Sequence, residues 1–150
     1  MTELKLIALD EEDLKVISAH LQDAVTTVGD LAYLPAEKRF AVLLNRFDWI
    51  AAEQAAQGRG QYQRRRAALR FEQVTAARVR NISLDDKAQV LNLLAVQFDK
   101  VAEGDPGGQI SLIFAGDAAI QFDVQFIEAE LKDLGAVWST ASKPEHADEA

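Results

Sequence analysis

QISLIFAGDAAIQFDV, residues 109–124, is the stretch of sequence that decides the fold class. Residues 109–114 are mostly apolar, and Ala115-Gly116-Asp117 supplies a tight turn. From Ala119 to Val124 apolar and polar residues alternate, as expected of a half-exposed strand. The stretch therefore predicts an antiparallel hairpin.

Further strands are predicted on the N-terminal side of this hairpin. Residues 31–34 and 39–49 show the strand period and are joined by a proline-containing turn, which predicts a second hairpin. Residues 68–80 are predicted as one long strand that twists or bulges near Gln73, with residues 90–98 as its partner. Together these segments predict about six to seven strands in up-and-down succession.

Two helices are predicted, one near each end of the chain. The first begins after Asp10, which can cap it, and continues towards Gly29 because apolar residues recur near the helical period. The second covers residues 127–134, with Gly135 as its C-terminal stop. Residues 51–63 show no sustained apolar period and are predicted to form a surface loop.

The order of these elements predicts an α+β fold, in which one antiparallel sheet is covered by an N-terminal and a C-terminal helix. Leu4, Leu6 and Ala8 alternate ahead of the first helix, as in a short leading strand. A pleckstrin-homology-like half-barrel plugged by the last helix is the variant of this architecture to look for. That comparison concerns the fold alone and implies no function.

The length of 150 residues is typical of a single domain, which we expect to span residues 1–138. Residues 139–150 are small, polar and acidic and are expected to form a disordered tail. No apolar run approaches the roughly 20 residues that cross a bilayer, and no secretory signal is recognised. The chain has no cysteine, which excludes disulfides and thiolate chemistry. We therefore expect a cytoplasmic protein that does not bind membranes.

Charge is unevenly distributed along the chain. The net charge is −8, but residues 59–80 hold seven arginines against one acid, so this segment carries +6 and the rest −14. Guanidinium groups suit phosphates and carboxylates alike. The arginines could therefore pair with acidic groups of this protein or of a second copy, or they could bind a polyanion. The candidate binding residues are Arg64, Arg65, Arg66, Arg70, Arg78 and Arg80.

No combination of residues specifies a reaction, a metal or a cofactor. Nucleophilic catalysis needs a base within reach of the nucleophile, and the usual base is histidine. Of the two histidines, His20 lies at the margin of the first helix's apolar stripe and His146 lies in the tail. Asp85-Asp86 is typical of a turn and lacks the ligand spacing of a calcium loop. The glycines near residues 58–60 and 104–108 lack the spacing of a phosphate-binding loop. We assign no catalytic residue, no metal ligand and no cofactor.

Four segments give the chain a resemblance to a known family. They are Asn45-Arg46-Phe47-Asp48-Trp49, residues 64–71, residues 114–120 and residues 128–135. With them the chain, from Leu4 to about His146, resembles an uncharacterised bacterial domain-of-unknown-function family of about this length. The resemblance implies a small stand-alone cytosolic bacterial protein and brings no known activity. Asp117 departs from the glycine expected there in relatives, which should be harmless in a turn.

Three function classes follow from these observations. The first is a non-enzymatic interaction domain that binds a protein partner, or itself, through a sheet edge or the arginine-bearing face. The second is a domain that binds nucleic acid or a phosphate ligand through the arginines of residues 64–80. The third, an enzyme that uses carboxylates and arginine alone, stays open, and a pocket with a strongly perturbed carboxylate would favour it.

Overall fold

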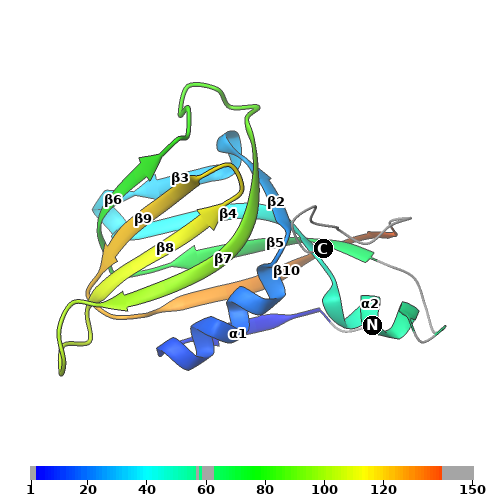
Figure 1. The fold of residues 1–150 in the computed structure, drawn as a ribbon, viewed down its shortest axis with the longest axis horizontal. Helices are drawn as coiled ribbons and strands as arrows, with labels where there is room; N and C mark the ends of the chain where they lie inside the picture. Colours follow the sequence, from blue (N-terminus) through cyan, green and yellow to red (C-terminus); the bar gives the residue numbers. More distant parts are fainter. Residues whose placement is uncertain (1–2, 57, 59–62, 140–150) are drawn as a thin grey trace.

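A ten-stranded antiparallel sheet dominates the computed structural model, which describes residues 3–56, 58 and 63–139 (Figure 1). The strands are β1 (Lys5–Ala8), β2 (Ala24–Thr27), β3 (Leu31–Leu34), β4 (Arg39–Phe47), β5 (Gln63–Phe71), β6 (Val74–Arg80), β7 (Val90–Lys100), β8 (Gly108–Phe114), β9 (Ala118–Val124) and β10 (Ala129–Ser139). The helices are α1 (Glu11–Leu21) and α2 (Trp49–Ala56), with short 3₁₀ turns η1 (Val28–Asp30) and η2 (Pro35–Glu37). The antiparallel sheet is confirmed, but it has more strands than the six to seven predicted.

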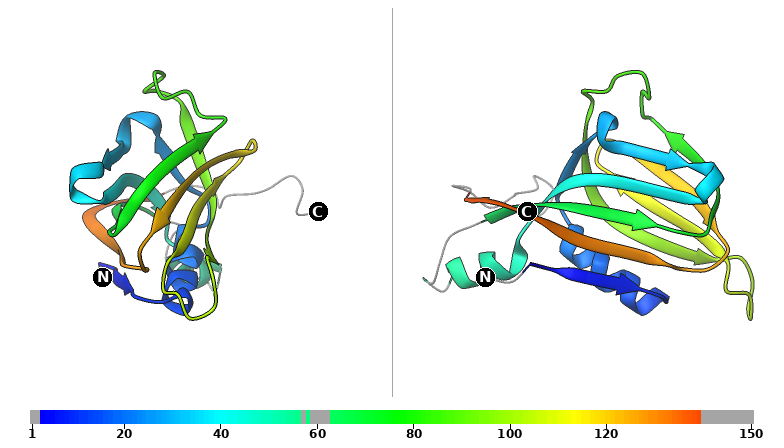
Figure 2. Two further views of the ribbon diagram at one scale, coloured as in Figure 1. Left: turned by 90° about the vertical axis from the view of Figure 1, so that its left-hand side faces the viewer. Right: turned by 180° about the vertical axis from the view of Figure 1, so that it is seen from behind.

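The strands do not follow one another in up-and-down succession. Their order in the sheet is β1-β10-β5-β4-β2-β7-β8-β9-β6, and β3 pairs with β4 beside this path. Thus β5 and β6, consecutive in the chain, lie far apart in the sheet. The sheet curls, as both views in Figure 2 show, and brings the start of β6 back to η2. There the Val74 amide donates a hydrogen bond to the Lys38 carbonyl at 3.0 Å.

The hairpin that begins the sequence argument is confirmed as β8 and β9, which pair in register from Gly108 with Val124 to Phe114 with Ala118. Gly116 and Asp117 in the turn both have positive φ angles, of 79° and 60°. Glycine adopts this conformation freely, and aspartate tolerates it better than most residues. Asp117 is therefore accommodated where glycine is expected in relatives.

The predicted C-terminal helix is wrong, because residues 129–134 belong to β10, which lies between β1 and β5. Ala129, Leu131 and Asp133 alternate into the interior and are buried, whereas Leu134, which would lie on the apolar face of such a helix with Leu131, is exposed. Hydrogen bonding to two neighbouring strands outweighs the local helical preference, which is a weak determinant. Gly135, with a φ of 88°, lies at a register shift of β10 instead of ending a helix.

The N-terminal helix and the strand ahead of it are confirmed, although α1 is shorter than predicted. The Asp10 carboxylate accepts a hydrogen bond from the Asp13 amide at 2.8 Å and caps the helix. The helix ends at Leu21, and Asp23, with a φ of 66°, turns the chain into β2. The β-branched residues of β2 favour a strand, which the helical interpretation up to Gly29 missed.

Residues 49–56 are helical, so a loop over residues 51–63 is wrong in its first part. The Asp48 carboxylate accepts a hydrogen bond from the Ala51 amide at 3.0 Å, in the manner of an N-cap, and the following alanines favour a helix. Residues 57 and 59–62 of the predicted loop lie outside the described residues. The same holds for residues 140–150 of the predicted tail.

The predicted long strand 68–80 is divided at Gln73, whose φ is 63°. On one side β5 pairs with β4 and β10, and on the other β6 pairs with β9. The predicted partner, residues 90–98, belongs to β7 and lies between β2 and β8. The suspected irregularity near Gln73 is thus the point where the chain leaves one part of the sheet for another.

A single cluster of buried hydrophobic residues fills the interior of the curled sheet. The Phe122 ring lies 5.3 Å from that of Phe40 and 4.8 Å from that of Phe71, measured between centroids. Helix α1 packs against β7 and β1 and adds Leu14 and Ile17 to the cluster. Within the described part of the chain, neither helix has the length and apolar character needed to cross a membrane.

Candidate interaction site

The six candidate arginines do not lie together. Four are on β5 and two on β6, at separate places in the strand order. Successive residues of a strand point to opposite faces, so Arg65 enters the interior while Arg66 and Arg70 lie on the other face. The structure therefore divides the predicted site into a buried residue and several surface residues.

Most of these arginines bind carboxylates of the same chain. The ion pairs are Arg65 with Asp48, Arg66 with Asp30, Arg70 with Glu72 and Glu130, Arg78 with Asp123, and Arg80 with Asp117. The hydrogen bond from Arg70 to Glu72 raises the pKa of Arg70. Arg64 lies 5.6 Å from the Phe47 ring centroid and donates to the Asp23 carbonyl at 3.3 Å. These contacts match the interpretation in which the cluster pairs with the protein's own acidic groups.

Two buried ion pairs lie side by side where β4, β5 and β10 meet. Arg46 donates two hydrogen bonds to Asp133, at 2.8 and 2.9 Å, and Arg65 donates one to Asp48 at 2.7 Å. Burial acts to raise the pKa values of both carboxyls. The hydrogen bonds from the arginines and from backbone amides outweigh burial, so both pKa values lie below their usual range. The four buried charges are therefore mutually compensated.

His20 lies half-buried on α1, close enough to these pairs to interact with them electrostatically. Burial lowers the pKa of His20 and Arg46 lowers it further, while Asp48 and Asp133 act in the opposite direction. No hydrogen bond to its side chain is present in the described part of the chain. The predicted position at the margin of the apolar stripe is confirmed. Among the described residues no nucleophile is hydrogen-bonded to His20, as one would be in a catalytic triad.

Sequence reasoning missed the burial of Arg46, Asp48 and Asp133. The signal lies in the two-residue alternation of β4, where residues 40, 42 and 44 are buried and apolar. Residues 46 and 48 continue the same spacing and therefore face the same interior. Charged residues at inward-facing positions of a strand predict partners inside the fold, because an unpaired buried charge is very costly.

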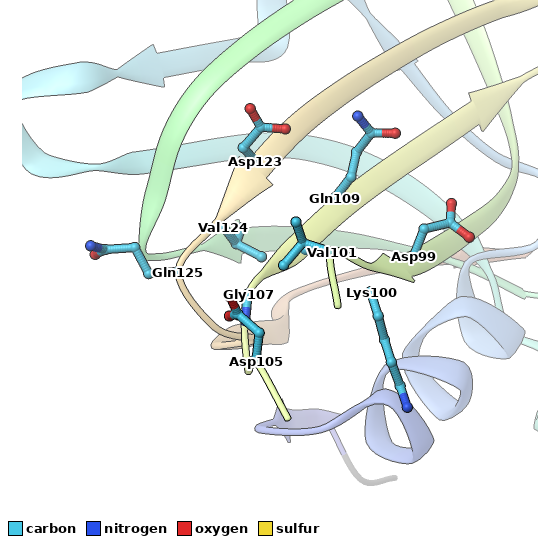
Figure 3. A pocket seen from close by; sticks show the side chains of 10 residues that line it. Asp99, Lys100, Val101, Asp105, Gly107, Gln109, Asp123, Val124 and Gln125 are labelled. Atoms are coloured by element: carbon cyan, nitrogen blue, oxygen red, sulfur yellow. The ribbon is translucent and has the colours of Figure 1, made fainter. Parts of the chain in front are cut away.

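An open hollow of about 710 Å³ lies at the ends of β7, β8 and β9 (Figure 3). Asp99, Gln109 and Asp123 are in register on adjacent strands and lie side by side, with the glutamine between the two carboxylates. Asp123 already binds Arg78, and Asp105 accepts a hydrogen bond from the Gly107 amide within its own turn. Among the described residues no group of three potential ligands could hold a metal ion.

A second groove lies between β3 and β6, and we call it the seam. Among the described strands, β3 pairs only with β4, and β6 pairs only with β9, so each presents an edge without a neighbouring strand. The seam has a volume of about 350 Å³. Figure 1 shows β3 and β6 on the same side of the curled sheet. The lining of the seam includes Leu31 and Tyr33 of β3, Ala77 and Val79 of β6, and Phe40 and Ile120 beneath them.

Hydrogen bonds hold the segments that border the seam at both ends. At one end the Val74 amide donates to the Lys38 carbonyl, which joins β6 to the turn after β3. At the other, the amides of Val28 and Gly29 donate to carbonyls of Gln89 and Lys87, at 3.0 and 2.9 Å. These hydrogen bonds fix the backbone at both ends of the seam.

Two inward-facing side chains are left uncovered in the seam. Tyr33 is paired in register with Phe40, and Val79 with Ile120, so they share the inner face with residues that are 4% and 1% exposed. Tyr33 itself is 38% exposed and Val79 is 40% exposed. Both side chains therefore lie on strands that each present an edge without a neighbour among the described strands.

Fold and site together define the chain as an α+β domain with one large curled antiparallel sheet, a pair of buried salt bridges and an uncovered apolar seam. The chain belongs to the family described as protein of unknown function (DUF2948), whose model matches residues 4–146. The predicted resemblance to a family of unknown function is thereby confirmed. No curated protein and no solved structure matches the chain.

Proposed function

We propose that the protein is a non-enzymatic interaction domain that binds an extended segment of a protein partner in the seam. The observation that carries the proposal is the exposure of inward-facing Tyr33 and Val79 between two strand edges that lack neighbours among the described strands. An extended segment would cover these side chains and supply hydrogen-bonding partners to the edge of β6 or β3. This is the mode of binding in which a peptide adds a strand to an exposed sheet edge.

We prefer the sheet edge to the arginine-bearing face as the surface that binds the partner. Carboxylates of the same chain already bind Arg66, Arg70, Arg78 and Arg80, so a partner would have to compete for these side chains. A partner that covers the apolar side chains of the seam does not have to displace a carboxylate, because the burial of apolar surface is itself favourable. We keep the cytoplasm as the expected location, since a chain without cysteine is suited to a reducing compartment.

Peptide selection tests this proposal without knowledge of the natural partner. A displayed library of random linear peptides is selected on the wild-type protein, and binders are mapped by amide chemical-shift changes. We expect binders whose shifts concentrate on β3 and β6, and whose affinity falls roughly tenfold or more in Val79→Lys, which places a charge in the seam.

The matched control is Ile7→Lys on β1, the strand at the other end of the sheet order, where Ile7 is exposed. This variant should bind the selected peptides as the wild type does. The proposal fails if selection yields no binders, or if the binders keep full affinity for Val79→Lys.

A further inference from the structure

We infer that the segment bound in the seam is acidic: apolar side chains face the floor, and carboxylates face outward toward Arg78 and Lys87. The inference rests on the proposed function and adds the chemistry of the partner. It starts from the charge of the lining, which includes Arg78 and Lys87 and no aspartate or glutamate.

The first of these cations, Arg78, would lie beside a strand added in the seam. Arg78 lies between Ala77 and Val79, which share the inner face, so its side chain belongs to the outer face of β6. A residue beside it on an added strand would form a cross-strand pair, and opposite charges stabilise such pairs. Arg78 also binds Asp123 at 3.1 Å, and a guanidinium group can bind more than one carboxylate.

Lys87 supplies a second, unengaged positive charge at the end of the seam bordered by η1. The backbone of Lys87 is fixed by the hydrogen bond from the Gly29 amide, while its side chain is exposed. Within the described ranges its ammonium group forms no ion pair, although the whole chain carries a net charge of −8. An unpaired cation on an acidic protein attracts an anionic group of a partner.

Successive residues of a strand point to opposite faces. One extended segment can therefore pack apolar side chains into the seam and also present carboxylates to Arg78 and Lys87. Its inward residues, two apart, would cover Tyr33 and Val79, and the residues between them would point outward. A segment of alternating apolar and acidic residues fits this arrangement. A basic segment would place like charges beside Arg78 and Lys87, which is unfavourable.

The experiment compares three synthetic peptides that differ only in their outward residues: alternating valine and glutamate, valine and glutamine, and valine and lysine. Binding to the full chain is measured by fluorescence anisotropy at low and high salt, and the site is mapped by amide shifts. We expect the glutamate peptide to bind most tightly. Lys87→Glu should weaken it by roughly two- to fivefold and should lower its salt dependence.

Lys132→Glu is the matched control, because Lys132 is an exposed lysine on β10 and its reversal changes the net charge equally. This variant should leave the affinity for the glutamate peptide unchanged. If the glutamine or lysine peptide binds the seam as tightly as the glutamate peptide, the acidic specificity is wrong while seam binding stands. If no peptide perturbs β3 and β6, or if the chain occupies the seam by self-association, the proposed function itself fails.

Discussion

Two ion pairs, Arg46 with Asp133 and Arg65 with Asp48, are buried in the interior. The side chains of both arginines are only 4% exposed. The attraction within such a pair roughly offsets the cost of removing two charges from water, so it adds little net stability over apolar residues. Removing one partner is different, because a charge is then left buried without compensation.

Asp133→Asn therefore tests the pair most directly. We expect it to lower the free energy of unfolding by about 3–5 kcal/mol, because Arg46 keeps its charge in the interior. The double variant Arg46→Leu with Asp133→Leu should lose clearly less free energy of unfolding than Asp133→Asn. Lys15→Ala, which breaks an exposed pair with Glu12, should change the free energy by less than about 0.5 kcal/mol. Urea titration measures all three, and a double variant as unstable as the single one would contradict the interpretation.

The lowered pKa values make stability depend on pH in two steps. His20 has a lowered pKa, so the unfolded chain binds its proton more readily, and stability is lost as the pH falls below about 6.5. Asp48 and Asp133 also have lowered pKa values, so a second loss begins below about pH 4. Melting temperatures measured from pH 8 to pH 3 should show both steps. His20→Asn should remove the upper step alone, and an unchanged profile in that variant would refute the assignment.

Helices and strands differ in how far the local sequence determined them. The hairpin of residues 109–124 and the start of α1 were predictable, because a tight turn and a capping carboxylate are local signals. The last helix was predicted wrongly because the spacing of Leu131 and Leu134 fits a helical face, while the alternation of Ala129, Leu131 and Asp133 fits a strand equally well. Pairing with β1 and β5 decides between them, and neither neighbour is near in sequence.

The candidate site was less predictable than the fold for the same reason. Arg64 to Arg80 stand out in the sequence, but their carboxylate partners come from distant strands and turns, such as Asp30 and Asp123. The seam lies between β3 and β6, whose facing edges depend on the curl of the whole sheet. Alternation within a single strand could identify Val79 as inward-facing. It could not show that Val79 lies at a strand edge without a neighbour among the described strands.

Helix α1 offers a test of the local signals. Replacing Asp10 with alanine removes the side chain that accepts the hydrogen bond from the Asp13 amide. We expect the free energy of unfolding to fall by about 1 kcal/mol, as for other N-cap substitutions. Glu11→Gln in the same first turn removes a favourable interaction with the helix dipole and should cost about 0.3 kcal/mol. Equal losses in the two variants would show that the Asp10 cap contributes nothing specific.

The molecule as a whole combines an acidic surface with arginines that are mostly engaged in ion pairs. A protein that binds nucleic acid needs cations free to replace the counterions of the phosphates. Here the described part of the positive segment, residues 63–80, is folded against carboxylates of η1, β9 and β10, among them Asp30, Asp123 and Glu130. Most of the arginine charge in this part is thus balanced by carboxylates across the sheet.

Polyanion binding should accordingly be absent. We expect neither single-stranded RNA nor duplex DNA, each fluorescently labelled, to bind the wild type at low salt. Arg66→Ser with Arg70→Ser is the suitable comparison, because both side chains lie at the surface, whereas replacing Arg65 would leave Asp48 buried without its partner. Binding by the wild type, with a salt dependence that becomes shallower by roughly two units in this variant, would mean that the arginines leave their carboxylates for phosphates. In that event the surface of β5, and not the seam, would be the site of interaction.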